Sequence, residues 1–324
     1  MSRPNVHVTQ PIHEDGLALL RAGADVSVGF GPEAVTLDTV LPHVEGLLLR
    51  YGGVSREVVE SAPKLRVISR AGAGYESIPV DAARARGIPV LIPQSANSRS
   101  VAEHVFALLL AVYRAIPHWD AMARSGRSDL FELRESSLSH ELSGKRLGLV
   151  GMGAIGTEVA RIGRDGFLMD VFAYHPRRSP DEIRAMGITP LTGLDELLAQ
   201  CDIVTVHVPL TDETRGMLGR EEFRAMRPNG VLINVARGGV VDEAALAEAL
   251  EAGELAGAGI DVWADKVPGA DNPLLAQGAK VVASPHRAGR TEEAQRRAGV
   301  LAAQGLLDAL GGAETTGVDD VTRR

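Results

Sequence analysis

A glycine-rich turn that joins an apolar run to a helical segment constrains the fold of this chain more than any other feature. The apolar run is Leu147–Val150, and Gly151, Gly153 and Gly156 follow it in the pattern G-x-G-x-x-G. Gly151 permits a tight turn, Gly153 lets the main chain approach a phosphate, and Gly156 lets the helix pack closely on its strand. The pattern therefore predicts a dinucleotide site whose pyrophosphate lies at a helix N-terminus.

Apolar runs of strand length alternate with helical segments along the chain, which is typical of a parallel α/β architecture. The predicted strands are Val6–Thr9, Gly46–Leu49, Leu65–Ser69, Val90–Ile92, Leu147–Val150, Val171–Tyr174, Ile203–Val208, Val231–Val235, Gly259–Val262 and Val281–Ser284. The clearest helical segments are Val54–Ser61, Val80–Arg86, Ser100–Ile116 and Thr291–Leu310.

The glycine turn lies near the middle of the 324 residues, so a complete α/β unit precedes it. We therefore expect two Rossmann-like domains, each a doubly wound parallel sheet, with a cleft between them. Residues 99–287 are predicted to form the NAD(P)-binding domain, and residues 1–98 with 288–324 a flavodoxin-like substrate (catalytic) domain. The last helix would return to this substrate domain, and the polar residues Gly311–Arg324 would form a loose tail.

The composition restricts the classes of partner. A net charge of −8 leaves no basic stripe for a nucleic acid or an acidic membrane surface. Cys201 is the only cysteine, which argues against a disulfide or a cysteine-rich metal site and is typical of a reducing cytoplasm. Neither a signal pattern nor an apolar run of membrane-spanning length is present. We expect a soluble cytoplasmic protein that binds no metal.

The end of the second predicted strand of the dinucleotide domain bears on the choice of cofactor. NAD-binding units place a carboxylate there, about 20 residues beyond the glycines, where it binds the ribose hydroxyls. This chain has His175 at that point, followed closely by Arg177 and Arg178, whereas Asp170 lies too early in the strand. A pair of guanidinium groups suits a 2′-phosphate, so the sequence favours NADP(H) over NAD(H). If both arginines form only a solvated basic loop, NAD(H) remains possible.

Three later strand ends carry residues suited to hydride-transfer chemistry. Arg237 lies between an apolar strand and a Gly-Gly turn, where its guanidinium would bind a substrate carboxylate and polarise the adjacent carbonyl. Asp261 lies in the second of these strand ends, Gly259–Trp263. His286 follows the third strand, where its imidazole would protonate a nascent alkoxide.

These motifs, in this order, resemble those of the D-2-hydroxyacid dehydrogenase family, which includes glyoxylate/hydroxypyruvate reductases. The resemblance extends over nearly the whole chain. The motifs that carry it are Gly72–Gly74, Asn97–Glu103, the glycine turn, Asn234–Glu243, Gly259–Val262 and Ser284–Gly289.

The resemblance implies a role for each matching residue. Arg237 would bind and activate a 2-oxo acid, and His286 would be the general acid for its reduction. The backbone around Gly72, Ala73 and Gly74 would hold the substrate carboxylate. Asp261 would bind the nicotinamide carboxamide, and the other cofactor contacts would come from Val101, Ala154, Ile155, Val208, Pro209, Thr214, Ala236, Ala288 and Gly289. The resemblance also implies a homodimer formed through the helix that begins near Ser98.

The chain departs from the family pattern at Lys266. Family members usually have a glutamate there, which supports the protonated form of the catalytic histidine, whereas a nearby ammonium would lower the pKa of His286. Three explanations remain open. Lys266 points to solvent and Asp265 pairs with His286; Lys266 binds a second anionic group of the substrate; or the protein has lost much activity and is a dinucleotide-sensing, corepressor-like interaction protein.

Other cations support the second explanation. Arg50 and Tyr51 end an early strand, and Arg287 follows His286. If they face the cleft, they would form a locally cationic pocket with Arg237 and Lys266, which favours a multiply charged substrate. The alternative is that Arg50 and Arg287 are solvated or paired with surface acids. The sequence therefore predicts an oxidoreductase that reduces a 2-oxo acid to a D-2-hydroxy acid, and that substrate carries a second anionic group if Lys266 enters the pocket.

Overall fold

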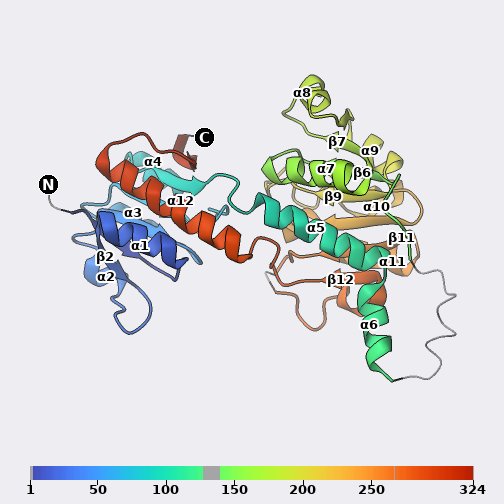
Figure 1. Cartoon of the computed structure of the whole chain (residues 1–324), viewed down its shortest axis with the longest axis horizontal. Helices are drawn as coiled ribbons and strands as arrows, with labels where there is room; N and C mark the ends of the chain where they lie inside the picture. Colours follow the sequence, from blue (N-terminus) through green and yellow to red (C-terminus); the bar gives the residue numbers. More distant parts are fainter. Residues whose placement is uncertain (1–2, 127–138, 266, 324) are drawn as a thin grey trace. The chain divides into compact units, whose positions relative to one another are not determined.

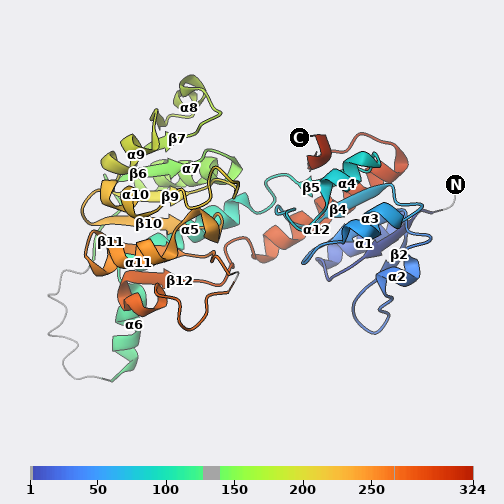
Figure 2. The same ribbon diagram turned by 180° about the vertical axis from the view of Figure 1, so that it is seen from behind.

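The computed structural model describes residues 3–126, 139–265 and 267–323, so the position of Lys266 lies outside the described residues. The chain divides into two compact units (Figures 1 and 2). Unit 1 comprises Met1–Asn97 and Arg290–Arg324, and unit 2 comprises Ser98–Gly289.

Unit 1 contains a six-stranded sheet in the order β13-β5-β4-β3-β1-β2. Its strands are β1 (Asn5–Val8), β2 (Asp25–Val28), β3 (Gly46–Leu49), β4 (Val67–Arg70), β5 (Val90–Pro93) and β13 (Val318–Asp320). The first five are parallel, and β13 pairs antiparallel with β5. The parallel order is the flavodoxin-like one, in which the strand order reverses between β1 and β3.

Helices cover both faces of this sheet. They are α1 (Glu14–Gly23), α2 (Leu37–Val40), α3 (Arg56–Ser61), α4 (Val80–Ala85) and α12 (Glu292–Gly311). In β3, Leu47 and Leu49 belong to the core beneath α3 and α4, whereas Leu48 belongs to the core beneath α1 and α12. Helices α1 and α12 lie side by side (Figure 1), and a Cβ on Gly16 would come within 2.6 Å of the Gly299 carbonyl. Glycine at this crossing therefore permits the close approach.

The C-terminal residues are ordered in the sheet, so the prediction of a loose tail is wrong. Strand β13 adds to the sheet edge, and Val321, in the short helix η4 (Val321–Arg323), is only 2% exposed. The Asp320 side chain accepts a hydrogen bond from the backbone N–H of Val90 at 3.3 Å. Two buried valines, Val318 and Val321, anchor an otherwise polar segment. Two apolar residues are too few to predict a strand from the sequence.

Unit 2 contains a seven-stranded sheet in the order β12-β11-β10-β9-β6-β7-β8, in which all pairings are parallel. Its strands are β6 (Arg146–Val150), β7 (Asp170–Tyr174), β8 (Thr189–Pro190), β9 (Ile203–Val206), β10 (Gly230–Asn234), β11 (Leu255–Ile260) and β12 (Val281–Ala283). This is the Rossmann order with one further strand, and it reverses between β6 and β9. The predicted fold class, two doubly wound α/β units, is confirmed.

The helices of unit 2 also form two layers. They are α5 (Ser98–Tyr113), α6 (Ile116–Arg124), α7 (Ala154–Phe167), α8 (Pro180–Ala185), α9 (Leu194–Gln200), α10 (Arg220–Ala225) and α11 (Glu243–Glu251), with the short helices η2 (Gly238–Val240) and η3 (Leu275–Lys280). One core lies beneath α5 and α7, and the other beneath α9, α10 and α11.

The helix predicted over Ser100–Ile116 is broken near its end. Ala115 has a φ of +46°, and the axes of α5 and α6 differ by 61°. Pro117 lacks the N–H that would bond to Tyr113, whose carbonyl instead accepts from the backbone of His140. Among the described residues, no single helix is long and apolar enough to cross a membrane, although α5 and α6 taken together meet that test of length and composition.

Candidate functional site

The glycine turn has the geometry that a dinucleotide pyrophosphate requires. Gly151 has a φ of +102°, and a Cβ on it would lie 2.8 Å from the carbonyl oxygen of His207. A Cβ on Gly156 would lie 2.4 Å from the Gly151 carbonyl oxygen. A Cβ on Gly153, by contrast, would meet no atom within 4 Å. The first and third glycines are therefore needed for packing, and the second faces open space.

Helix α7 begins at this open side. Its N-cap is Gly153, which offers no side-chain oxygen, so no side chain caps the N-terminal N–H groups. The predicted residues Ala154 and Ile155 form the start of the helix. Uncapped N–H groups and the positive end of the helix dipole fit a bound phosphate, so these residues fit the pyrophosphate of a dinucleotide.

His207 follows β9, on the other side of the point where the strand order reverses. Its Nε2 lies 3.1 Å from the hydroxyl of Thr205, and its Nδ1 is buried with no hydrogen-bond partner among the described residues. Burial lowers the pKa of His207 to about 3, so the ring is neutral. The sequence analysis did not identify His207, although a histidine that ends a buried strand beside the glycine turn was a usable signal.

The predicted cofactor-lining residues after β9 lie in one loop. Val208 is half-buried, Pro209 is exposed, and the hydroxyl of Thr214 donates to the Pro209 carbonyl at 2.6 Å. Other predicted cofactor residues have little exposed surface. The side chains of Val101, Ala236 and Ala288 are buried in the hydrophobic core, and Gly289 is half-buried.

His175 organises the loop that follows β7. Its Nδ1 accepts hydrogen bonds from the backbone N–H groups of Arg177 and Arg178, at 3.1 and 3.0 Å. Burial, and then the positive charges of Arg178 and Arg177, lower the pKa of His175. A neutral imidazole at the position of the expected carboxylate therefore presents the two arginines together. The nearby Glu182 is engaged with Ser179 in the capping box of α8.

The three predicted catalytic strand ends lie side by side in the sheet, because β10, β11 and β12 are consecutive (Figure 2). The backbone N–H of Asp261 donates to the Asn234 carbonyl at 3.0 Å, and the N–H of His286 donates to the Asp261 carbonyl at 2.7 Å. The side chain of Asn234 bonds to the backbone of Ala236 and Arg237. Hydrogen bonds between neighbouring strand ends thus hold Arg237, Asp261 and His286 together at one edge of the sheet.

The Asp261 carboxylate is fully buried and binds the turn that carries His286. It accepts hydrogen bonds from the Ser284 hydroxyl at 2.6 Å and from the backbone N–H groups of Arg287 and Ala288 at 2.7 and 2.9 Å. The Nε2 of His104, on α5, lies 2.9 Å from that hydroxyl and 3.5 Å from the carboxylate. Burial raises the pKa of Asp261, but these hydrogen bonds, led by His104, outweigh it and lower the pKa. The sequence analysis assigned no role to His104 or to the Ser284 hydroxyl.

His286 has a left-handed backbone conformation, with a φ of +54°, and its side chain is exposed. This conformation costs a β-carbon residue about 1 kcal/mol or more, and such strain is concentrated at functional sites. The bonds from the turn to Asp261 maintain it. The imidazole is therefore presented from a rigid turn at the carboxyl end of β12.

The segment after Trp263 is anchored by Glu243 of α11. One carboxylate oxygen accepts from the backbone N–H of Ala264 at 2.7 Å, and the other from the side chain of Asn272 at 2.6 Å. Asp265, the predicted substitute for the family glutamate, is exposed. Lys266 lies outside the described residues, so the three explanations for it stay predictions.

The predicted substrate-binding residues of unit 1 lie together. Arg50, after β3, donates from Nη1 to the Ala71 carbonyl at 2.6 Å, and a Cβ on Gly72 would lie 3.2 Å from that nitrogen. Ala73 is exposed, and Gly72 and Gly74 are half-buried. Among the residues that the structure describes, no group of histidine, cysteine and carboxylate side chains could hold a metal ion.

Known proteins resemble this chain over nearly its whole length. A family model described as the NAD-binding domain of D-isomer-specific 2-hydroxyacid dehydrogenases matches residues 106–288. A D-3-phosphoglycerate dehydrogenase of Methanocaldococcus jannaschii is 39% identical over 306 residues, which cover 94% of this chain and 57% of that protein. A glyoxylate reductase of Thermococcus litoralis is 35% identical over 312 residues, which cover 94% of this chain and 93% of that protein.

A solved structure agrees with this relationship. The NADPH-dependent glyoxylate/hydroxypyruvate reductase of Sinorhizobium meliloti, in complex with NADP and malonate, has a TM-score of 0.82 and 28% identity, with 99% of this chain and 98% of that chain covered. The present chain spans little more than half the length of the phosphoglycerate dehydrogenases that it matches. The family model, the glyoxylate reductase and the fold agree, and the chain belongs to the D-isomer-specific 2-hydroxyacid dehydrogenase family.

Proposed function

We propose that this protein reduces a 2-oxo acid to the D-2-hydroxy acid by hydride transfer from NAD(P)H. The proposal rests on one observation: hydrogen bonds hold Arg237, Asp261 and His286 together at the carboxyl ends of three neighbouring strands. The same sheet carries the open glycine turn after β6. Ligands of open α/β sheets bind outside the carboxyl ends of the strands, which is where all these groups lie.

Each residue has a defined part in the proposed reaction. The Arg237 guanidinium would bind the substrate carboxylate and polarise the C2 carbonyl. A bound reduced nicotinamide would supply the hydride that C2 accepts. The carbonyl oxygen would then take a proton from the imidazolium of His286, which is left neutral. Asp261 would hold the His286 turn, in addition to the carboxamide contact expected from the family resemblance.

The proposed cofactor preference is NADP(H) over NAD(H). Support comes from the neutral His175 and from Arg177 and Arg178, whose backbone it fixes. A ribose 2′-phosphate would accept from such guanidinium groups, whereas the residue directly after β7, where a carboxylate would bind a free 2′-hydroxyl, is His175. The related reductase of Sinorhizobium meliloti is named as NADPH-dependent, which agrees with this preference.

Unit 1 would supply the substrate-binding groups. The backbone of Gly72, Ala73 and Gly74 would bind the substrate carboxylate, and Arg50 would lie beside it. The proposal extends to 2-oxo acids with a second anionic group, because Arg50 is half-buried and, among the described residues, pairs with no carboxylate. The names of the relatives, glyoxylate reductase and phosphoglycerate dehydrogenase, cover acids of both kinds.

A homodimer and a cytoplasmic location complete the proposal. Helix α6 has no buried residue, and Ile116 at its start is 54% exposed. Association with a second copy through this region is what the family resemblance implies for the helix that begins near Ser98. The single cysteine supports a reducing compartment.

The test is oxidation of NADPH and of NADH by the purified protein with glyoxylate, hydroxypyruvate, pyruvate, phenylpyruvate and oxaloacetate. We expect turnover of at least one acid, faster with NADPH, and loss of that turnover in His286→Asn. Cofactor binding without turnover of any acid would contradict the proposal. That outcome would favour the alternative, a dinucleotide-sensing interaction protein.

A further inference from the structure

Tyr51 in unit 1 lies beneath two guanidinium groups. The central carbon of Arg50 lies 4.9 Å from the centre of the Tyr51 ring, and that of Arg290 lies 5.1 Å from it. The Tyr51 side chain is 40% exposed, so the three side chains meet at the surface of the unit rather than in its core. Tyr51 lies in the N-terminal segment of unit 1 and Arg290 in its C-terminal segment, where Arg290 directly precedes the N-cap of α12.

The three side chains lie where a ligand is expected. The order of parallel strands in unit 1 reverses between β1 and β3, and Arg50 and Tyr51 directly follow β3. Gln10, just after β1, fixes them, because its side-chain oxygen accepts from the backbone N–H groups of Arg50 and Tyr51 at 3.0 and 3.2 Å. Such reversal points are the usual binding sites of open α/β sheets.

The two positive charges have no carboxylate partner in the part of the chain that the structure describes. Burial lowers the pKa of Arg50, Tyr51 raises it, and the positive charge of Arg290 lowers it further. Among the described residues, no carboxylate forms an ion pair with Arg50 or Arg290. Two guanidinium groups on one ring repel each other, and a bound anion would remove that repulsion while accepting hydrogen bonds from both.

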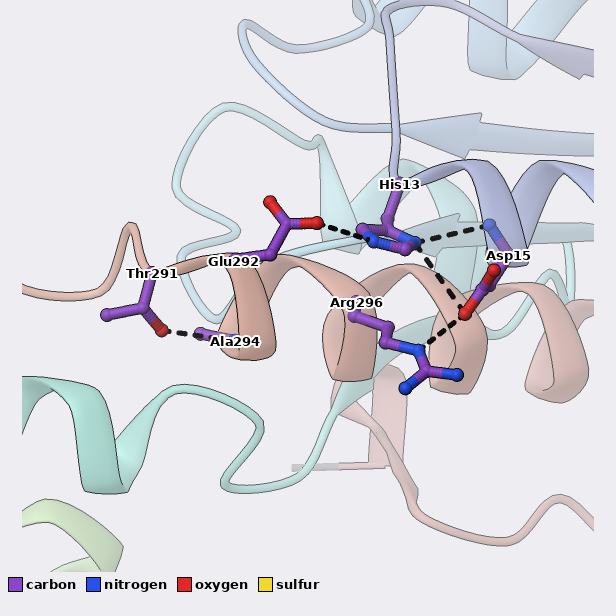
Figure 3. Close-up of polar contacts among 6 residues, drawn as sticks. All are labelled: His13, Asp15, Thr291, Glu292, Ala294 and Arg296. Atoms are coloured by element: carbon purple, nitrogen blue, oxygen red, sulfur yellow. Dashed lines mark hydrogen bonds and ion pairs between the residues drawn. The ribbon is translucent and has the colours of Figure 1, made fainter.

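The acidic side chains nearest in sequence to Arg290 are mostly engaged elsewhere (Figure 3). Glu292 accepts from Nε2 of His13 at 2.9 Å. The His13 Nδ1 accepts from the backbone of Asp15, which requires the proton to be on Nε2. Asp15 in turn is paired with Arg296 at 2.5 Å. Glu293 is exposed. The carboxylates of Glu292 and Asp15 are thus already engaged with His13 and Arg296.

We infer that Arg50, Tyr51 and Arg290 form a subsite for a second anionic group, a carboxylate or a phosphate, on the 2-oxo acid substrate. This inference rests on the proposed function. The Tyr51 ring keeps the two guanidinium groups apart and oriented, and the anion binds to their N–H groups. Preference for doubly anionic acids is then a property of unit 1, separate from the proton and hydride chemistry of unit 2.

The test compares matched pairs of acids. Phosphohydroxypyruvate differs from hydroxypyruvate by a phosphate, and oxaloacetate differs from 2-oxobutanoate by a carboxylate in place of a methyl group. For Arg290→Gln we expect kcat/KM to fall about 10- to 100-fold for the doubly anionic member of at least one pair, through KM. The singly anionic member should change less than about threefold, and it also reports whether the variant is folded. The pair that responds identifies phosphate or carboxylate.

Three further variants sharpen the test. Arg290→Lys should recover part of the kcat/KM that Arg290→Gln loses, because lysine keeps the positive charge but lacks the planar guanidinium. Tyr51→Phe should retain the preference for doubly anionic acids, because the aromatic ring remains. Arg21→Gln removes one exposed charge at the far end of α1 and should leave both members of each pair unchanged. An equal effect of Arg290→Gln on both members, or no effect on either, overturns the inference.

Failure of the proposed function is distinguishable from failure of the subsite. If the wild-type protein turns over no 2-oxo acid, binding of inorganic phosphate and of D-malate is measured by calorimetry on the full chain. Binding that weakens at least tenfold in Arg290→Gln retains the anion subsite without the dehydrogenase activity. Binding that is absent, or the same in both proteins, overturns the subsite as well.

Discussion

The two units repeat one architecture but differ in what they place where the strand order reverses. In unit 2 that point is lined by backbone: Gly151 and Gly153 on one side and the carbonyl of His207 on the other. In unit 1 it is lined by side chains, with Gln10 fixing Arg50 and Tyr51. Backbone N–H groups suit the diphosphate that is common to all dinucleotide cofactors. Side chains instead determine which charge and shape of ligand a site accepts. The family model describes residues 106–288, in unit 2, as an NAD-binding domain, and substrate selection is the task proposed for unit 1.

The sharpest way to break this division is to remove the proposed acid from unit 2. In His286→Asn we expect kcat to fall by about 10²- to 10⁴-fold, because the general acid is lost. Asparagine tolerates the left-handed backbone at this position, so the turn on Asp261 should persist. Steady-state kinetics check the rate, and NADPH titration checks that the dissociation constant changes less than about threefold. Activity close to wild type would remove His286 from the mechanism.

A second change weakens the carbonyl-polarising group and keeps its charge. Arg237→Lys loses the planar fork, and we expect kcat/KM to fall by about 10²- to 10³-fold for every substrate. The effect should be the same for singly and doubly anionic acids, in contrast to Arg290→Gln in unit 1. A loss confined to doubly anionic acids would show that the two units do not divide these tasks as proposed.

The cofactor preference is tested in the loop after β7. Replacing Arg177 and Arg178 together by glutamine should raise the KM for NADPH about 10- to 100-fold and leave the KM for NADH nearly unchanged. As a control, Arg184→Gln on α8 removes an exposed arginine that pairs with Asp181 and should change neither value. Equal KM values for NADPH before and after the double change would rule out a phosphate contact by these arginines.

Two histidines whose pKa values are lowered in the folded protein, His207 and His7, make the folded state sensitive to acid. Burial lowers the pKa of His207 to about 3 in the folded protein, against 6.5 when exposed. A histidine with a lowered pKa contributes its full stabilisation above about pH 6.5. As the pH falls below this value, the free energy of unfolding decreases by up to about 1.4 kcal/mol per pH unit for each such histidine. His7 in unit 1, whose pKa burial also lowers, should add a smaller loss of the same sign.

Urea unfolding between about pH 7 and pH 5 measures this loss. In His207→Asn the dependence on pH should become shallower, whereas in His43→Asn, at an exposed position, it should match the wild type. If both variants retain the full dependence, His207 is not a source of the acid sensitivity.

The sequence predicted those parts of the fold and site that depend on local pattern. The glycine turn and the strand ends at Arg237, Asp261 and His286 are recognisable because each follows an apolar run directly. Strand β2 was missed because polar residues, Asp25 and Ser27, occupy half of its short length.

Other features depend on partners far away in sequence. His104 reaches Ser284 across 180 positions, and Arg290 reaches Tyr51 from the opposite end of the chain. No local pattern marks such contacts, because they exist only once the sheets are assembled. The tail after Gly311 was mistaken for a loose segment for the same reason: its order comes from pairing with β5.

The most direct test of the central claim follows the hydride itself. The protein is supplied with NADPH that carries deuterium at C4 of the nicotinamide, one diastereomer at a time, and with the best 2-oxo acid. The product is analysed by mass spectrometry and chiral chromatography. We predict a D-2-hydroxy acid with one deuterium at C2 from one of the two diastereomers. An L product, or a product without deuterium from either diastereomer, would contradict the account.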